Sequence, residues 1–391
     1  MKTTRRAFLG HSAAAGLMVT LSTPRIPADI IPSAVLQSIG DAIAKAIKSG
    51  ACPGVAIELS YKGSPMFHRG FGSANLETGS PVTETSVYRI GSLTKQFTAA
   101  MVIKLCLQGK LKLDDPVGSY LPSFVSLQPV TLSELLQHTG GIHSDEESTQ
   151  FFSSSDEKTQ LHLAEDISRQ KKVFDFAPGT AWLYSNANYV VLGAVIEQVS
   201  GESLRDAAQE LIVEPLHLTA TSFDRSADVV PGRVSGYSPQ PGSNPPFVNA
   251  PYIPISEAGG AGAMRSTVVD LCRWHYALLT AQLFPASFVE LMMTPGRLRD
   301  GSLSGSRRFS ANDAAMGDTQ YGMGLLLPPS FQNHRSILHY GAIEGFAACL
   351  ETYVDLKLTL AILCNGDNNP DLPFRAVRKI VQKQILATIH S

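Results

Sequence analysis

The feature that most constrains the fold is the presence of strand-like segments near both ends of a long chain. The early segments are Gly54–Tyr61 and Met66–Phe71, and the late ones are Ser336–Tyr340, Phe346–Tyr353 and Leu358–Cys364. Short apolar runs bounded by turn residues are typical of strands, and the Lys62-Gly63 and Asp355-Leu356 turns predict antiparallel neighbours. We therefore expect the early and late strands to share one sheet.

The chain between these two strand groups is predicted to be mostly helical. Helical patterns separated by polar loops dominate from Ser92 to about Thr267, and they include Leu132–Gln137 and Asn188–Val199. Together with the strands, this order predicts an α/β fold in which an antiparallel sheet carries an inserted, mostly helical region. We expect residues 31–91 together with 268–391 to form the α/β part and residues 92–267 the helical part. The active site is expected at the seam between them.

Two further helices are predicted to flank the sheet, one from each end of the chain. The first covers Ser33–Ser49 and stops at Gly50, and the second covers Pro373–Ile389. Residues 1–30 precede them and pair Arg5 and Arg6 in TTRRAFLG with the short apolar segment HSAAAGLMVTLS. This segment resembles a twin-arginine export signal, and its apolar part is too short to remain as a membrane-spanning helix. We expect an exported protein, periplasmic or extracellular, without a membrane span; a disordered N-terminus with a chance arginine pair is the alternative.

The amino-acid composition indicates which kind of molecule the protein binds. The chain has 391 residues, of which 44% are hydrophobic, and it balances 32 Lys and Arg against 34 Asp and Glu. Such a chain can build a large core, and it has no basic patch that would favour nucleic acid. The five cysteines are scattered without a C-x-x-C pair, which favours free buried thiols over a metal site. We therefore expect a small-molecule or peptide substrate.

A serine and a lysine spaced like a catalytic pair occur at the start of an apolar helix. Ser92 and Lys95 lie three positions apart in YRIGSLTKQFTAAMVIK, so they share one helix face. Two other S-x-x-K matches, at Ser155 and Ser168, lie in polar runs typical of solvated surface. Burial of Lys95 would favour its neutral amine, which predicts a nucleophile beside its base. The alternative is a helix-capping serine with a lysine that extends to solvent.

A second candidate cluster is Tyr184-Ser185-Asn186, the only Y-x-N among eleven tyrosines. A phenol beside a lysine ammonium is drawn towards its phenolate and can act as a general base. The amide of Asn186 can bond to a substrate carbonyl and to a lysine. Taken alone, the segment is explained better by a half-buried aromatic residue in a loop beside a helix-capping asparagine.

Two of the His-x-Gly stretches in the sequence compete for a third cluster. His138 ends the helical segment TLSELLQHTGG, whose glycines are expected to terminate the helix, so a capping role is favoured there. His339 lies on the strand RSILHYG, which as an edge strand could pair with an extended substrate. The backbone N–H of Ala342, beyond the flexible Gly341, is predicted to form an oxyanion hole with the N–H of Ser92.

Taken in order, the S-x-x-K, Y-x-N and H-x-G clusters resemble the three signatures of the serine penicillin-recognising enzymes. The Y-x-N form is similar to the branch of class C β-lactamases, serine D-Ala-D-Ala carboxypeptidases, D-aminopeptidases and related esterases. The framing segments GKLKLDDPVGSYLP, LLQHTGGI, YSNANYVVLG and GGAGAMRSTVVDL are similar to that branch as well, and the resemblance runs from about residue 33 to 385. It implies a class C β-lactamase/DD-peptidase-like fold and acyl transfer through Ser92, with Lys95 and Tyr184 sharing the proton transfers.

The sequence also departs from this pattern. Class C β-lactamases usually carry lysine where this chain has His339, which weakens the interpretation as an antibiotic hydrolase. With an ordinary pKa of roughly 6.5, that histidine would gain a charge, and affinity for carboxylates, on acidification towards pH 6. Should carboxylates be favoured at every pH, Arg335 is the alternative cation.

We expect an exported serine hydrolase that forms an acyl-enzyme with an amide or ester carbonyl of a D-amino acid peptide, small ester or β-lactam. The alternatives are a class C β-lactamase proper and a non-catalytic penicillin-binding-like scaffold. No cofactor or metal is expected. His138, His143 and Asp145 are conceivable metal ligands, but their spacing matches no known closed site.

Overall fold

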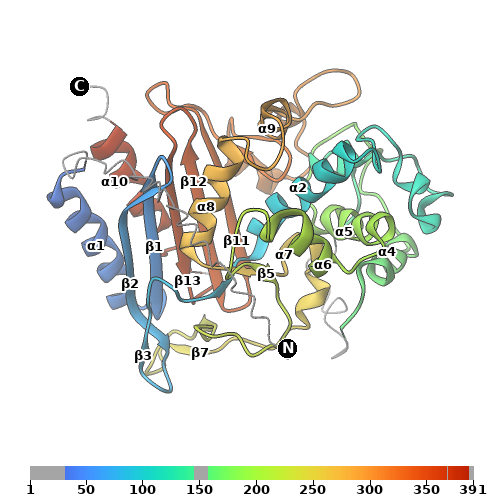
Figure 1. The fold of residues 1–391 in the computed structure, drawn as a ribbon. Coiled ribbons are helices and arrows are strands. Elements are labelled where there is room, and N and C mark those ends of the chain that lie inside the picture. Colours follow the sequence, from blue (N-terminus) through green and yellow to red (C-terminus); the bar gives the residue numbers. More distant parts are fainter. Residues whose placement is uncertain (1–30, 145–156, 368, 387–391) are drawn as a thin grey trace, which may run out of the picture.

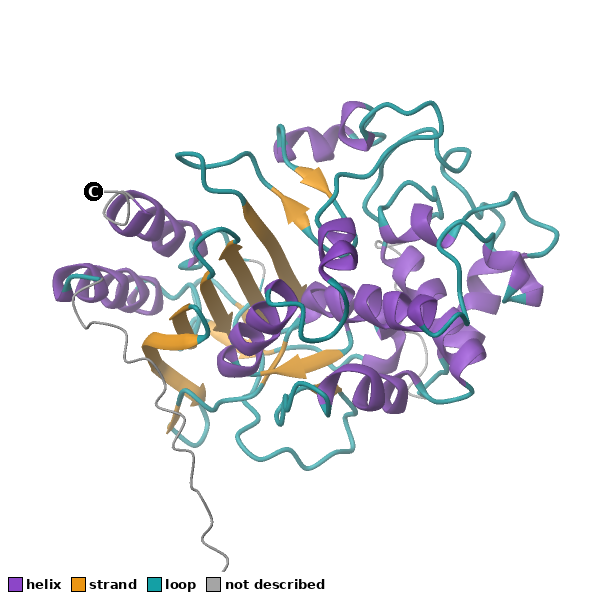
Figure 2. Ribbon diagram, turned by 45° about the horizontal axis from the view of Figure 1, so that its top comes forward, coloured by secondary structure: helices purple, strands orange, loops and turns teal. Residues whose placement is uncertain are grey.

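The computed structural model describes residues 31–144, 157–367 and 369–386. The export segment predicted for residues 1–30 lies outside this range. A central antiparallel sheet lies between two groups of helices (Figures 1 and 2). Among the described helices, none is both long and apolar enough to cross a membrane.

The sheet has eight strands in the order β3-β2-β1-β13-β12-β11-β10-β9, and every neighbouring pair is antiparallel. Its strands are β1 (Gly54–Tyr61), β2 (Ser64–Asn75), β3 (Ser80–Pro81), β9 (Gln320–Tyr321), β10 (Leu326–Leu327), β11 (Ser336–Ile343), β12 (Phe346–Tyr353) and β13 (Leu358–Cys364). The predicted union of early and late strands is confirmed, because β1 pairs with β13 from Val55↔Cys364 to Tyr61↔Leu358.

Two details of the predicted sheet were wrong. Strand β2 extends beyond Met66–Phe71 at both ends, and β11 is not the edge strand along its whole length, because Leu338 pairs with Leu326 of β10. The two-residue strands β9 and β10 are too short to show a period-2 pattern, so the sequence did not reveal them.

Helices α1 (Ser33–Lys48) and α10 (Phe374–Ile380) cover one face of the sheet. Because side chains alternate between the two faces of a strand, Val55, Ile57 and Leu59 of β1 all point towards these two helices. The three residues form one apolar core with α1 and α10. The C-terminal helix differs from its prediction, since after α10 the chain continues as a π-helical segment, Val381–Leu386, and residues 387–391 lie outside the described part.

The other face of the sheet contacts α8 (Val268–Leu279), with the remaining helices beyond it (Figure 2). These are α2 (Thr94–Leu107), α3 (Leu132–Leu136), α4 (Gln160–Ser168), α5 (Asn186–Ser200), α6 (Leu204–Ala208), α7 (Gly259–Gly262) and α9 (Ala286–Met292). Helix α2 is buried on almost every side, which explains why its apolar residues are spread around the helix instead of along one face. It carries the predicted nucleophile segment at its N-terminus.

Two small sheets complete the fold. Strands β4 (Tyr88–Arg89), β8 (Met264–Ser266) and β5 (Ser222–Phe223) form one, and β6 (Tyr237–Pro239) and β7 (Phe247–Asn249) form the other. The first was not predicted, and it matters here because β4 leads directly into the segment that carries Ser92. The division into residues 31–91 with 268–391 and residues 92–267 stays a prediction.

Candidate active site

Ser92 lies in a short 3-10 helix of one turn, Gly91–Leu93, that directly precedes α2. Gly91 has a φ of +50°, a left-handed conformation that favours glycine. The next residue that fixes the turn is Thr94, whose hydroxyl donates to the Gly91 carbonyl at 2.7 Å and accepts from the N–H of Met264 at 3.1 Å. Strand β8 therefore holds the turn from behind, and the Ser92 side chain stays half-buried.

Lys95 is completely buried, and its amine contacts Ser92 directly. Its Nζ lies 3.0 Å from Ser92 Oγ, 2.7 Å from Asn186 Oδ1 and 2.8 Å from the Ala261 carbonyl oxygen. The amide and carbonyl oxygens can only accept, so they take N–H groups of the amine. At the Ser92 contact, an ammonium would donate to Oγ, whereas a neutral amine would accept the hydroxyl proton. The geometry suits proton transfer in either direction.

A glycine-rich helix places the carbonyl of Ala261. A Cβ on Gly260 would lie 2.4 Å from the Tyr189 carbonyl oxygen, so only glycine allows α7 to pack this closely on α5. The amide of Gln160 fixes the same turn by accepting from the Gly260 N–H at 3.1 Å. The segment GGAGAMRSTVVDL, which the sequence marked only as a family-like frame, thus supplies a direct partner of Lys95.

Tyr184 and Asn186 reach the same amine from the start of α5. The Nζ of Lys95 lies 4.8 Å from the centroid of the Tyr184 ring, and Asn186 is the first residue of the helix. Between them, Ser185 points away and donates to the Ile142 carbonyl at 2.8 Å. Alternation along this extended stretch therefore turns both predicted side chains towards Lys95.

His138 packs behind Tyr184, with 4.4 Å between the two ring centroids. It does follow the end of α3, but the prediction that glycines terminate this helix was wrong. His138 itself adopts the left-handed conformation, with a φ of 59°, while the Thr139 N–H donates to the Glu134 carbonyl at 2.8 Å. Its Nδ1 faces the N–H of Ser185, and burial, followed by the charge of Lys95, holds the His138 pKa well below its usual value. This neutral ring supports Tyr184 from behind.

His339 is buried and bonded on both ring nitrogens. Its Nδ1 donates to the Tyr340 carbonyl at 2.6 Å, so Nε2 accepts, and the Tyr321 hydroxyl lies 3.1 Å from it. Burial, with a smaller effect from Lys95, lowers the His339 pKa to about 3. The expectation that it gains a charge near pH 6 was therefore wrong, because that expectation assumed a solvated ring. Tyr321, which no sequence pattern singled out, fixes the orientation of this imidazole.

Gly341 allows β11 to touch the nucleophile turn. A Cβ there would lie 2.0 Å from the Ile90 carbonyl oxygen, and a Cβ on Gly91 would lie 2.6 Å from the Ala342 carbonyl oxygen and 2.7 Å from its nitrogen. The two glycines thus face each other's backbones. This close approach brings the backbone of Ala342 beside the turn of Ser92, as the predicted oxyanion hole requires.

A cavity of about 660 Å³ adjoins Tyr184 and His339. Its remaining lining is mixed: Leu183, Met316, Leu326, Pro328 and Leu338 are apolar, and Ser310, Asp313, Thr319, Tyr340 and Arg378 are polar or charged. Size and lining fit a small-molecule or peptide side chain. Arg335 does not line it and instead forms a two-point ion pair with Glu290 at 3.1 Å, so the alternative cation is engaged elsewhere.

The metal alternative at His138, His143 and Asp145 finds no support in the described part of the chain. His143 contacts Asp175 at 2.9 Å, and Asp145 lies outside the described residues. No group of three or more metal-ligating side chains occurs within residues 31–144, 157–367 and 369–386.

The fold and site define a serine hydrolase related to the penicillin-binding proteins. The family model described as Beta-lactamase matches residues 39–383, most of the chain, so the chain belongs to the β-lactamase family. PbpX of Bacillus subtilis (strain 168), a penicillin-binding protein by name, is 28% identical over 309 residues, which cover 76% of this chain and 71% of that protein.

Solved structures agree with this family. A D-stereospecific amidohydrolase from Streptomyces sp. is 27% identical with a TM-score of 0.70, and the match covers 90% of this chain and 98% of that one. An octameric penicillin-binding protein homologue from Pyrococcus abyssi is 24% identical with a TM-score of 0.74, covering 89% of this chain and 79% of that one. The second likeness shows the fold alone, and the predicted fold class is confirmed.

Proposed function

We propose that the protein hydrolyses an amide or ester through an acyl-enzyme on Ser92. The observation that carries the proposal is the 3.0 Å contact between Ser92 Oγ and the amine of a completely buried lysine. In the first step Oγ bonds to the substrate carbonyl carbon, and the bond to the leaving amine or alcohol breaks. Water then cleaves the acyl ester and restores the serine.

Lys95 and Tyr184 share the proton transfers in this proposal. The proton of Ser92 passes to the pair and on to the leaving group, and the pair returns a proton to Oγ during deacylation. Asn186 and the Ala261 carbonyl hold the amine in position, at 2.7 Å and 2.8 Å. Because the two groups are neighbours, with Lys95 Nζ 4.8 Å from the centroid of the Tyr184 ring, we assign the base role to the pair.

The developing oxyanion is proposed to bind the backbone N–H groups of Ser92 and Ala342. The mutual approach of Gly91 and Gly341 supports this assignment, because it brings the two backbone segments together. Fixed donors of this kind stabilise charge that appears only in the transition state.

We propose amides of D-amino acids, including short peptides, as the favoured substrates. The D-stereospecific amidohydrolase from Streptomyces sp. supports this class, and so does the cavity beside Tyr184, which offers both apolar and polar side chains to an amino acid amide. The neutral His339 argues against a β-lactamase that relies on a fixed cation at this position. Small esters are expected to react as well, since they need the same acyl transfer and a better leaving group.

One experiment tests the assignment. The protein is incubated with a D-amino acid amide, its L enantiomer, a D-Ala-D-Ala peptide, a penicillin and a p-nitrophenyl ester, while turnover and intact mass are followed. We expect turnover of the D-amide and the ester, with slow release of a penicillin adduct on Ser92. Rapid penicillin turnover would indicate a β-lactamase, and neither adduct nor turnover would indicate the scaffold.

Export remains part of the proposal. It rests on the Arg5-Arg6 pair and the apolar segment that follows, which lie outside the described residues. Fusion of residues 1–30 to a reporter that is active only after export tests it, with Arg5→Lys and Arg6→Lys together expected to abolish transport.

A further inference from the structure

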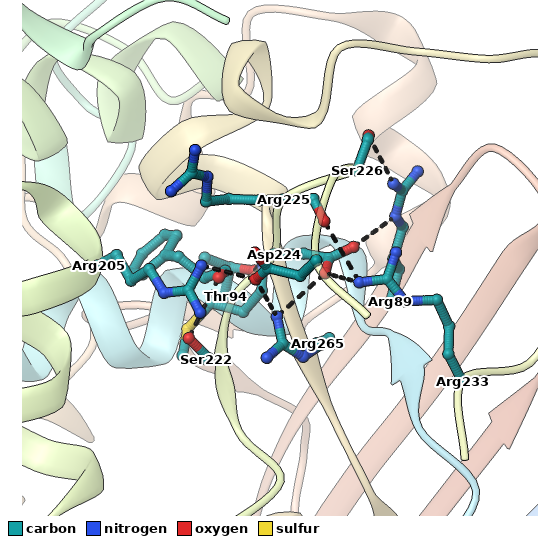
Figure 3. A network of polar contacts seen from close by, with 12 residues as sticks. Arg89, Thr94, Arg205, Ser222, Asp224, Arg225, Ser226, Arg233 and Arg265 are labelled. Carbon is teal, nitrogen blue, oxygen red and sulfur yellow. Dashed lines mark hydrogen bonds and ion pairs between the residues drawn. The ribbon is translucent and has the colours of Figure 1, made fainter. Parts of the chain in front are cut away.

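Three arginines converge on a single buried aspartate behind the nucleophile turn (Figure 3). Asp224 Oδ2 lies 2.9 Å from Arg89 Nε, and its Oδ1 lies 2.6 Å from Arg233 Nη2 and 3.1 Å from Arg265 Nη1. The three arginines come from β4, from the loop after β5 and from β8. The Asp224 side chain is only 1% exposed, so its negative charge interacts with these arginines and not with solvent.

The cluster has more positive than negative charge. One carboxylate faces three guanidinium groups, and the nearest further acid, Asp228, lies 3.6 Å from Arg265 but 2.7 Å from Arg205, which it already pairs. Burial, opposed by Asp224 and reinforced by the neighbouring arginines, lowers the pKa of Arg233. One arginine would be enough to hold Asp224, and each additional guanidinium brings like-charge repulsion that packing alone does not require.

These arginines line a cavity of about 350 Å³. Asp224 also lines it, together with Glu344 from the turn between β11 and β12 and Phe346 from the start of β12. Within the described residues, the Nε atoms of Arg233 and Arg265 are buried without a hydrogen-bond acceptor. Buried guanidinium donors without acceptors, beside a cavity with excess positive charge, are the features of a phosphate or carboxylate site.

We propose that this cavity binds the phosphate or carboxylate group of a ligand, at a site separate from the cavity beside Tyr184. Arg89 precedes Ser92 by three residues, so their Cα atoms lie within about 11 Å of each other. A bound anion would therefore act on the strand that positions the nucleophile. The binding itself is independent of the proposed hydrolysis, and it can be measured without any substrate.

Calorimetric titration of the purified protein with inorganic phosphate, and separately with succinate, at constant ionic strength tests the site. We expect saturable binding of at least one anion, and the tighter one identifies the group on the ligand. Arg233→Gln, the change at the most exposed of the three, should weaken binding about tenfold or more, because one charge-assisted hydrogen bond is lost. Arg169→Gln, at an exposed arginine paired with Glu165, is the matched control and should leave affinity unchanged.

Asp224→Asn should change anion affinity in the opposite direction from Arg233→Gln. Among the residues that the structure describes, Asp224 carries the only carboxylate that contacts all three arginines. Its removal should therefore raise anion affinity severalfold even though folding stability falls. A general folding defect would instead weaken binding in both variants. Failure of both anions to bind, or equal affinity in wild type and Arg233→Gln, would overturn the proposal, and the Arg233→Gln comparison stands alone if Asp224→Asn does not fold.

Discussion

Replacing Gly341 by alanine tests how closely catalysis depends on the contact between β11 and the nucleophile turn. The new Cβ would stand 2.0 Å from the Ile90 carbonyl oxygen, whereas Cβ contacts below 3.0 Å essentially do not occur. The strand and the turn must therefore separate by about 1 Å. The Ile90 carbonyl also accepts from Leu93 N–H at 3.2 Å, so the turn that carries Ser92 cannot yield without moving the nucleophile. A misplacement of this size typically costs about a hundredfold in rate, and we expect that loss in kcat/KM.

The assay compares kcat/KM for a D-amino acid amide and a p-nitrophenyl ester in folded protein, with circular dichroism and Tm measured on the same samples. Gly91→Ala, which clashes with the Ala342 backbone from the other side, should give a similar loss. Gly40→Ala, within α1, is the control. Its Cβ would meet only the ring of Phe71, at an ordinary contact distance of 3.8 Å, so this variant should leave activity unchanged. Wild-type kcat/KM in folded Gly341→Ala would refute the reasoning.

Three further outcomes follow from the site. Ser92→Ala should abolish turnover and covalent labelling in intact mass, whereas Ser168→Ala should change neither; full activity in Ser92→Ala would remove the assignment. Tyr184→Phe should lower kcat about a hundredfold or more with little change in Tm, and an unchanged kcat would transfer its role to the lysine. Because the His339 pKa is about 3, the imidazole stays neutral from pH 6 to 8.5. The kcat/KM ratio for a free-acid substrate and its methyl ester should therefore be flat with pH, while His339→Lys should raise the ratio; a wild-type ratio that climbs towards pH 6 would contradict the buried, neutral ring.

The sequence predicted the parts of the fold that long periodic segments encode. Strands β1, β12 and β13 were predicted with the bounds found in the structure, because they are buried on both faces and their sequences are mostly apolar. The small sheet that contains β4 was missed, since its two- and three-residue strands depend on tertiary contacts. Local patterns do not encode such pairings.

The candidate site divides in the same way. Ser92, Lys95, Tyr184 and Asn186 stood out because their spacing within each short motif determines which side chains face one another. The Ala261 carbonyl could not be found, because a backbone acceptor leaves no residue-type signature. The pKa of His339 was equally hidden, since it depends on burial that only the assembled structure creates.

The pairing of β1 with β13 has a consequence for the newly made chain. Strand β1 is translated early, but most of the sequence must follow before Val55 can meet Cys364. In the interval, the hairpin of β1 and β2 presents an unpaired backbone edge with Val55, Ile57 and Leu59 along it, and such an edge pairs readily with other chains. Ribosome-bound or C-terminally truncated forms should therefore self-associate through this edge. Once β13 has been synthesised, its pairing with β1 covers the edge and protects the chain from aggregation.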